Sequence, residues 1–421
     1  MTRTEERLTD ALTAAARAIP EDMLRPLIAP PSRRRRSAWV APLAAALGIV
    51  LVVGLAIALG TRLSSSGSSS GPVGSAAPVP RYYVVAGLQG GPPVVRSRTT
   101  GKISGIAPVS KSANNGVADL VASARSGTFF VMAAAPGASG ERLYRFSLTR
   151  SGKVTGFAAV PGGAFGNRNW TPDAMAASAD GSQVAVSFAF AYVGPSCGST
   201  GEQPCPTPRP DYIDIIDTGT GARSVWQGGT DPEFSVASLS WTADGRQLVY
   251  LGQSCRRLQL NSEACAHGGR TAEVRALNPA AGGGRLDSGP VLLPQSAQYP
   301  YIAQAQITPD GTTITAVVLT GRMSSAHGLS DMVPPDLSVI QVSRATGQLL
   351  RVLYQRDLGP TSEVNNGPDF LQLSQDSAGR HWMLNGGLCV GPCTDGFNGW
   401  LRDGGLVPLV PRNGRELYQA W

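Results

Sequence analysis

The sequence predicts an all-β ectodomain, a six-bladed β-propeller, preceded by one transmembrane helix and a short cytoplasmic helix. A strand–turn–strand unit that recurs along the C-terminal four fifths of the 421-residue chain predicts the propeller. A single long uncharged apolar run near the N-terminus predicts the membrane helix. Four segments follow: a cytoplasmic segment (1–36), a transmembrane helix (37–61), a Ser/Gly/Pro-rich disordered linker (62–80) and the extracytoplasmic propeller (81–421).

The first repeated element is a strand, a tight turn ending in glycine, and a second strand. It occurs five times, as LVASARSGTFFVMA, AMAASADGSQVAVSF, VASLSWTADGRQLVYL, AQAQITPDGTTITAVVL and LQLSQDSAGRHWML. The turn glycines are Gly127, Gly181, Gly245, Gly311 and Gly379, at spacings of 54, 64, 66 and 68 residues. Asp-Gly turns between alternating apolar segments are a strong hairpin signal.

A second element, a strand closed by another glycine turn, follows each of the five, and a sixth copy, VVRSRTTGK, occurs at 94–102 before all of them. Six second elements against five first elements predict six four-stranded blades, one of which lacks its innermost strand locally. A ring of blades can take that strand from the other end of the chain. We therefore expect residues 415–421 (RELYQAW) to pair with the blade that contains residues 81–109.

The repeat motifs resemble those of TolB-type and WD40-like propellers of bacteria. The resemblance rests on T-A-D-G at 242–245, T-P-D-G at 308–311 and R-A-T-G at 344–347, and it covers roughly residues 81–421. It implies the propeller fold, which hosts binding, scaffolding and catalysis alike. The near Asp-box at 374–382 (SQDSAGRHW) is interpreted as a turn variant of the same repeat.

The apolar run from Ser37 to Thr61 is 25 residues long and uncharged, which is enough to cross a bilayer. Four arginines, 33–36, precede it, and Arg62 alone follows closely, so the N-terminus is predicted to be cytoplasmic and the C-terminal domain extracytoplasmic. A cleaved signal peptide is the alternative. Its apolar core is usually about 7–15 residues, and Pro78 follows the best cleavage candidate, which favours an uncleaved anchor.

Residues 4–19 predict a short amphipathic helix before the membrane, ended by Pro20. It lies near the bilayer or docks a cytoplasmic partner. The net charge of +7 is divided between +3 in the first 37 residues and +4 over the large remainder, which argues against nucleic-acid binding.

The six cysteines form three local pairs, and an even count in an exported domain predicts three disulfides. The pairs are Cys197/Cys205, Cys255/Cys265 and Cys389/Cys393. Only the last pair has zinc-like spacing, and no second pair or histidine set accompanies it, so no metal site is expected.

Binding is favoured over catalysis, and no cofactor is expected. The three histidines, His267, His327 and His381, have no sequence partner that suggests a triad, and the predicted innermost strands are poor in carboxylates and histidines. The favoured function is a binding, scaffold or sensor module. The alternative is a propeller hydrolase or lactonase with a site in the central channel.

The blade-joining loops are the predicted binding face, for an unknown protein or glycan outside the membrane. They carry rings that can stack and amides that can hydrogen-bond, although turns favour asparagine for their own reasons. The residues are Asn167, Asn169, Trp170, Tyr299, Tyr301, Asn365 and Asn366.

Overall fold

A computed structural model describes most of the C-terminal compact unit, residues 77–421. The described residues are 79–87, 92–109, 118–124, 127–134, 140–166, 170–190, 210–229, 234–253, 272–320, 336–357, 370–376, 378–387, 397–409 and 416–420. The predicted cytoplasmic, transmembrane and linker segments lie outside them, apart from residues 79 and 80. Within the described residues, no helix has the length and apolarity that a membrane span requires.

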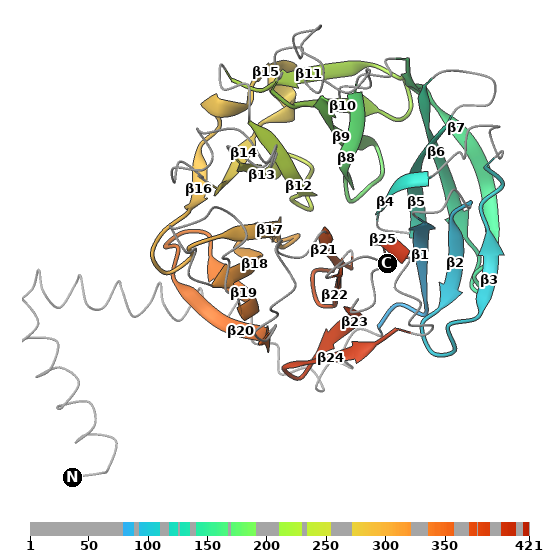
Figure 1. The fold of residues 1–421 in the computed structure, drawn as a ribbon. Coiled ribbons are helices and arrows are strands. Elements are labelled where there is room, and N and C mark those ends of the chain that lie inside the picture. The colour runs from blue at the N-terminus through green and yellow to red at the C-terminus, as the bar shows by residue number, and fades with distance from the viewer. Residues whose placement is uncertain are drawn as a thin grey trace, which may run out of the picture. The chain divides into compact units, whose positions relative to one another are not determined.

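Six sheets arranged around a central axis confirm the six-bladed propeller (Figure 1). Blade 1 comprises β25 (Glu416–Ala420), β1 (Tyr82–Gly87), β2 (Val94–Ser97) and β3 (Ile103–Ile106). Blade 2 comprises β4 (Ala118–Ser123), β5 (Thr128–Ala134), β6 (Glu141–Leu148) and β7 (Val154–Phe165). Blade 3 comprises β8 (Trp170–Ala177), β9 (Gln183–Phe190), β10 (Tyr212–Asp217), β11 (Arg223–Gln227) and the added β15 (Gly283–Arg285).

The other three blades have four strands each. Blade 4 comprises β12 (Ser235–Trp241), β13 (Leu248–Gln253), β14 (Ala272–Leu277) and β16 (Val291–Pro294). Blade 5 comprises β17 (Ile302–Ile307), β18 (Thr313–Thr320), β19 (Asp336–Ser343) and β20 (Leu349–Arg356). Blade 6 comprises β21 (Phe370–Gln375), β22 (Trp382–Gly387), β23 (Phe397–Arg402) and β24 (Gly405–Pro408).

The predicted closure of the ring is confirmed. β25 pairs antiparallel with β1 in a register that joins Ala420 to Val84. It therefore takes the innermost position of blade 1, and it also contacts β4 and β21, the innermost strands of the two neighbouring blades. The two ends of the propeller sequence thus meet in one sheet, and β1 has a strand partner on both of its edges.

The propeller has two ends that differ in their connections. At the turn end, short turns join the first strand of a blade to the second and, in most blades, the third to the fourth. At the opposite end, which we call the loop end, the outermost strand of one blade leads into the innermost strand of the next blade. The predicted Asp-Gly turns lie at the turn end: Thr242 donates its hydroxyl to Asp244 Oδ1 at 2.6 Å, and Gly245 has a φ of 67°. A positive φ at this position is what selects glycine.

Blades are held together by apolar packing between neighbouring sheets. The largest buried cluster joins blades 4 and 5 and includes Val249, Val274, Ile302 and Ile314. Similar clusters join blades 1 and 2, blades 3 and 4, and blades 5 and 6. Both faces of the second strand of a blade are covered, so β9, β13 and β18 are buried along most of their length.

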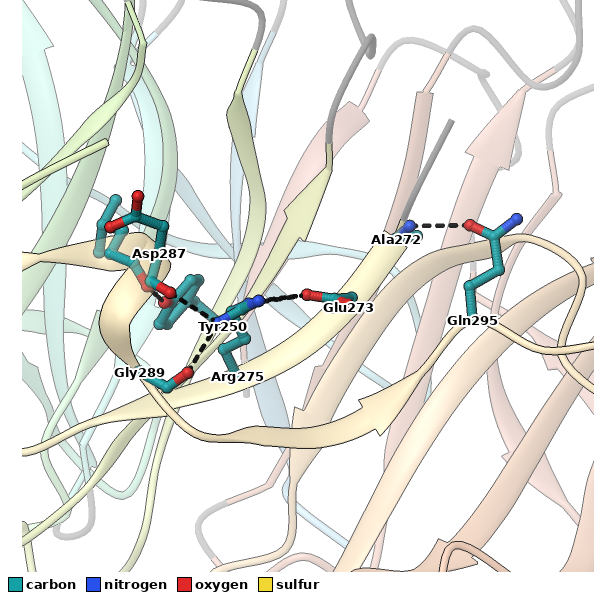
Figure 2. Close-up of polar contacts among 8 residues, drawn as sticks. Tyr250, Ala272, Glu273, Arg275, Asp287, Gly289 and Gln295 are labelled. Carbon is teal, nitrogen blue, oxygen red and sulfur yellow. Dashed lines mark hydrogen bonds and ion pairs between the residues drawn. The ribbon is translucent and has the colours of Figure 1, made fainter. Parts of the chain in front are cut away.

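The segment from Asn278 to Pro290 differs from the expected glycine turn. It is an excursion with two 3-10 helices, Pro279–Ala281 and Leu286–Ser288, and it carries β15, which pairs parallel with β11 of the neighbouring blade. Figure 2 shows how it is fixed: Arg275 donates to the carbonyls of Asp287 at 2.9 Å and Gly289 at 2.7 Å. The hydroxyl of Tyr250 donates to the carbonyl of Leu286, a fully buried residue. The excursion therefore covers the outer edge of blade 3.

One carboxylate is buried between blades 2 and 3. The Asp214 Oδ2 atom lies 3.5 Å from Arg223 Nη1, while its Oδ1 atom is buried with no hydrogen-bond partner. Burial raises the pKa of Asp214 to about 6, and Arg223 only partly opposes this. Arg223 also donates to the carbonyl of Gly162 and lies 4.3 Å from the Phe165 ring centroid, so it joins the two blades.

Asp214 should make the propeller less stable as the pH rises. The carboxyl of Asp214 has a pKa of about 6 in the folded state and about 3.8 in the unfolded state. Its contribution to the free energy of unfolding is therefore fully present below about pH 3.8 and is lost as the pH rises through about 6. Relative to wild type, Asp214→Asn should gain on the order of 2 kcal/mol of unfolding free energy between about pH 4 and about pH 7. Denaturant unfolding of both proteins across that range measures it; a pH-independent difference would contradict the assignment.

Candidate functional site: the axial cavity

A cavity of about 110 Å³ lies on the propeller axis, bounded by the innermost strand of every blade. Its lining comes from the C-terminal halves of β4, β8, β12, β17 and β21 and from Ala420 of β25. Since each of these strands runs toward the turn end, the cavity lies at that end. The lining residues are Val121–Ser123, Met175–Ala177, Ala179, Leu239–Trp241, Ala243, Gln306, Pro309, Gln372–Asp376 and Ala420.

Small and neutral side chains dominate the lining because six strands converge on one axis. Alanine or serine occupies positions 122, 123, 176, 177 and 240, and Trp241 is the one large ring there. The indole of Trp241 donates to the carbonyl of Ala176 at 3.1 Å, which fixes its orientation against blade 3. The predicted inner strands are thus confirmed as the strands that border the channel.

Polar side chains form hydrogen bonds between the innermost strands of neighbouring blades, and the two partners of each bond lie about one repeat apart in the sequence. Gln304 donates its Nε2 to the carbonyl of Ala237 at 3.1 Å, and Ser238 donates to the carbonyl of Ala305 at 2.9 Å. Gln375 donates to the carbonyl of Ile307 at 2.6 Å. A carbonyl can only accept, so the amide nitrogen of each glutamine must face it, and the amide oxygen is turned away.

Two polar atoms at the cavity wall are left without partners. Gln375 Oε1 and Ser374 Oγ are buried, and neither has a hydrogen-bond partner among the described residues. A buried polar group without a partner costs about 1–3 kcal/mol. These two atoms therefore retain unused hydrogen-bonding capacity, as an acceptor in the amide and in either role in the hydroxyl.

Asp376 is the single carboxylate in the lining, and its oxygens are already engaged. Its Oδ1 atom accepts from the backbone N–H groups of Arg380 at 2.7 Å and His381 at 3.1 Å. Its Oδ2 atom lies 2.7 Å from His381 Nδ1. Asp376 occupies the position that Thr242 and Thr308 hold in the turns of blades 4 and 5, and it shapes the turn by itself. The interpretation of SQDSAGRHW as a turn variant fits this geometry.

The geometry contains no catalytic triad at this point. A triad needs a hydroxyl or thiol hydrogen-bonded to the imidazole, and the nearby Ser374 Oγ has no hydrogen-bond partner. Within the part of the chain that the structure describes, no three His, Cys, Asp or Glu side chains converge to hold a metal ion. The residues that line the cavity can donate and accept hydrogen bonds, which is the chemistry of a binding pocket.

The predicted binding-face residues that the structure describes are packed. Tyr299 is 4% exposed, and its hydroxyl donates to the carbonyl of Gly347 at 3.0 Å, so it belongs to the core between blades 4 and 5. Trp170 is half-buried, with edge contacts to Phe190 and Tyr212 at centroid distances of 5.3 and 4.7 Å. Tyr301 is half-buried against blade 5.

The remaining predicted site residues lie outside the described residues. They are Asn167, Asn169, Asn365 and Asn366 and the six cysteines, Cys197, Cys205, Cys255, Cys265, Cys389 and Cys393. The strands that precede and follow the cysteine segments end at the loop end, opposite the axial cavity. The three disulfides and the glycan or protein contacts of this end stay predictions.

The axial cavity residues Ser374 and Gln375 were not expected as site residues. The only indication in the sequence was that they lie in a predicted innermost strand. That position does not show which side chains form hydrogen bonds to the neighbouring blade. The periodic glutamines at 304, 306 and 375 are the pattern that could have pointed to them.

No family model matches the chain, and no curated protein matches it. Among solved structures, TolB from Acinetobacter baumannii is similar over 81% of this chain and 65% of its own, at 16% identity and a TM-score of 0.40. Kuenenia stuttgartiensis hydrazine synthase is similar over 70% of this chain and 67% of its own, at 16% identity and a TM-score of 0.40. A Synechocystis apocarotenoid oxygenase mutant is similar over 79% and 71%, at 10% identity and a TM-score of 0.38. Likenesses of this strength carry no argument about function.

Proposed function

We propose that the chain is a membrane-anchored, extracytoplasmic binding module, acting as a scaffold or sensor, whose axial cavity receives a small polar group. The observation that carries this proposal is the lining of the cavity. Small neutral side chains from all six blades surround it, and its lining includes Ser374 and Gln375, whose Oγ and Oε1 atoms have no hydrogen-bond partner among the described residues. A ligand group that donates a hydrogen bond would satisfy the amide oxygen of Gln375, and this hydrogen bond would contribute to the affinity of the ligand.

The sequence supplies the cellular setting of this proposal. Residues 37–61 anchor the chain in the cell membrane, the linker separates the propeller from the bilayer, and residues 1–36 remain in the cytoplasm. In that arrangement, the effect of a ligand bound outside could be transmitted to a cytoplasmic partner only through residues 37–61. The loop end, with the predicted disulfides and Asn167, Asn169, Asn365 and Asn366, is proposed as a second contact area for a protein or glycan.

The alternative, a hydrolase or lactonase that uses the channel, would have to rely on Asp376 and His381. Their pair lies beside the cavity, but both carboxylate oxygens of Asp376 are held by its own turn. A general base needs a nucleophile within hydrogen-bond reach, and Ser374 Oγ is not hydrogen-bonded to the imidazole. Binding is therefore the function that this geometry supports better.

The two functions are separated by an assay of the purified propeller with ester, lactone and peptide substrates. We expect no turnover that depends on Asp376, so Asp376→Asn and wild type should be indistinguishable. Small primary amides and amines should raise the melting temperature of wild type by several degrees but have little effect on Gln375→Leu, which removes the unpartnered acceptor. Turnover lost in Asp376→Asn would establish the alternative, and equal thermal shifts in both proteins would exclude the cavity as the binding site.

A further inference from the structure

Charge is distributed unequally around the turn end of the propeller. Blades 6, 1 and 2, which are neighbours in the ring, carry seven basic and two acidic residues in the described part of this end. Blades 3, 4 and 5 carry four basic and five acidic residues there. We call the seven basic residues of the first group the basic arc: Arg81, Arg98, Lys102, Arg150, Lys153, Arg380 and Arg402.

The basic arc is exposed, and its acidic neighbours reduce its charge little. Six of its members are exposed, and Arg98 is partly buried. Of the two acids, Asp376 is buried and bonded to His381, while Asp403 pairs with Arg402 at 3.1 Å. Five exposed basic side chains and the half-buried Arg98 therefore lack a carboxylate partner of their own at this end.

Contacts between blades make the arc continuous. In blade 2, the turn that bears Arg150 and Lys153 lies against blade 1, since Ser104 of β3 donates to the carbonyl of Gly152 at 3.2 Å. Gly152 has a φ of 77°, and a Cβ placed there would come within 2.5 Å of the Tyr82 ring. These turns therefore lie against the first residues of β1.

On the other side, Trp400 joins blade 1 to blade 6. The guanidinium carbon of Arg98 lies 5.1 Å from its ring centroid, and that of Arg402 lies 5.8 Å from it. Burial lowers the pKa of Arg98, and the nearby Arg402 lowers it further. Two cations placed near one ring repel each other, so an anion between them would be stabilising.

The chain enters the propeller in the middle of the arc. Arg98 donates its Nε to the carbonyl of Pro80 at 3.1 Å, and its backbone N–H donates to the carbonyl of Arg81. The Ser- and Gly-rich sequence of residues 64–80 predicts a root-mean-square reach of roughly 23 Å for this linker. If residues 37–61 span the membrane, this part of the propeller stays close to the bilayer surface.

We propose that the basic arc binds the anionic phospholipid headgroups of the membrane that anchors the chain. This inference rests on the proposed membrane anchor, because a tether that ends at Pro80 would hold the arc near the lipid. Each basic residue near an anionic surface contributes favourably, and the effect falls off within a Debye length. The turn end then faces the bilayer, and the loop end with its predicted binding residues faces away from it.

The test uses the isolated propeller, residues 77–421, which is a compact unit closed by its own C-terminal strand. Co-sedimentation should show binding to vesicles of equal phosphatidylcholine and phosphatidylglycerol, none to phosphatidylcholine alone, and loss of binding at high salt. Replacing Lys102, Arg150, Lys153 and Arg402 with Gln should weaken binding by at least about tenfold. The matched control replaces Arg246, Arg285, Arg344 and Arg351, an equal loss of charge on blades 3, 4 and 5, and should retain binding.

Three results would overturn the proposal: no binding to the anionic vesicles, equal weakening in the control variant, or displacement of the vesicles by an equal concentration of inorganic phosphate. The last would identify a site for a free anion. Since the isolated propeller has no anchor, these outcomes leave the anchor itself to a separate experiment. Conversely, a chain found to be unanchored could still bind the vesicles, so the two failures are distinguishable.

Discussion

Removing residues 415–421 should abolish the cooperative folding of the propeller, or lower its free energy of unfolding by on the order of 5 kcal/mol, a large part of the stability of an ordinary domain. β25 supplies the innermost strand of blade 1, and it contacts the inner strands of blades 2 and 6. Without it, β1 loses one of its two strand partners and the ring opens beside the axial cavity. Exposed strand edges favour aggregation, so the truncated protein should also aggregate.

Removal of residues 1–76 is the matched control, because it deletes a separate unit and leaves every blade intact. Thermal unfolding of the control should match that of the full propeller, while the C-terminal truncation should melt far below it. A truncated protein that melts with the control would show that β25 is an accessory strand, and the six-blade account of this chain would then be wrong.

Replacing Tyr299 with Ala should cost about 3–5 kcal/mol of stability, as for other large rings removed from a core. Its ring is 4% exposed between blades 4 and 5, among Ile302, Val318 and Leu251. The hydroxyl donates to the carbonyl of Gly347, so Tyr299→Phe should cost only about 1 kcal/mol. Urea unfolding of the two variants separates the ring from the hydrogen bond.

Tyr301 provides the comparison for this experiment, since it is half-buried two residues away. Tyr301→Ala should destabilise the propeller less than Tyr299→Ala does. If Tyr299→Ala left stability unchanged, the ring would be free to leave the core, and its assignment to a binding face at the loop end would regain support.

The closure of the ring was predictable because it follows from counting. Each blade must present an inner strand to its neighbours, so one missing inner strand among six blades had to come from elsewhere, and RELYQAW was the only strand-like segment left over. The Asp-Gly turns were predictable for a local reason: Asp accepts hydrogen bonds from the turn backbone, and Gly adopts the positive φ that follows.

The excursion of blade 4 was not predictable from the same reasoning. The run NPAAGGGRLDSGP contains many turn residues, and nothing local distinguishes a tight turn from a longer excursion. Its position is set by distant groups, chiefly Arg275 and Tyr250, and by pairing with β11 of another blade. Interactions of this kind appear only when the blades are placed side by side.

The sequence predicted a binding face at the loop end, and it pointed to the central channel only as the site of the alternative hydrolase or lactonase. Innermost strands poor in carboxylates and histidines favoured binding over catalysis, but the unpartnered state of Gln375 Oε1 depends on which carbonyl of blade 5 its amide nitrogen meets. The loop-end residues were predicted as a binding face because their rings can stack and their amides can hydrogen-bond, whereas Tyr299 lies in the core between blades 4 and 5. The sequence pattern predicts where a loop lies. Whether one aromatic ring of that loop is buried depends on how the sheets on both sides pack.

The central claim, a propeller held outside the membrane by residues 37–61, is tested most directly with a specific protease site inserted between residues 64 and 80. Protease added to intact protoplasts should release a folded propeller into the medium and leave residues 1–36 protected with the membrane. A propeller already free in the medium before protease is added would show that the apolar segment is a cleaved signal peptide. A propeller that stays with the protoplasts, uncut, although lysed protoplasts release it, would place it in the cytoplasm and contradict the account.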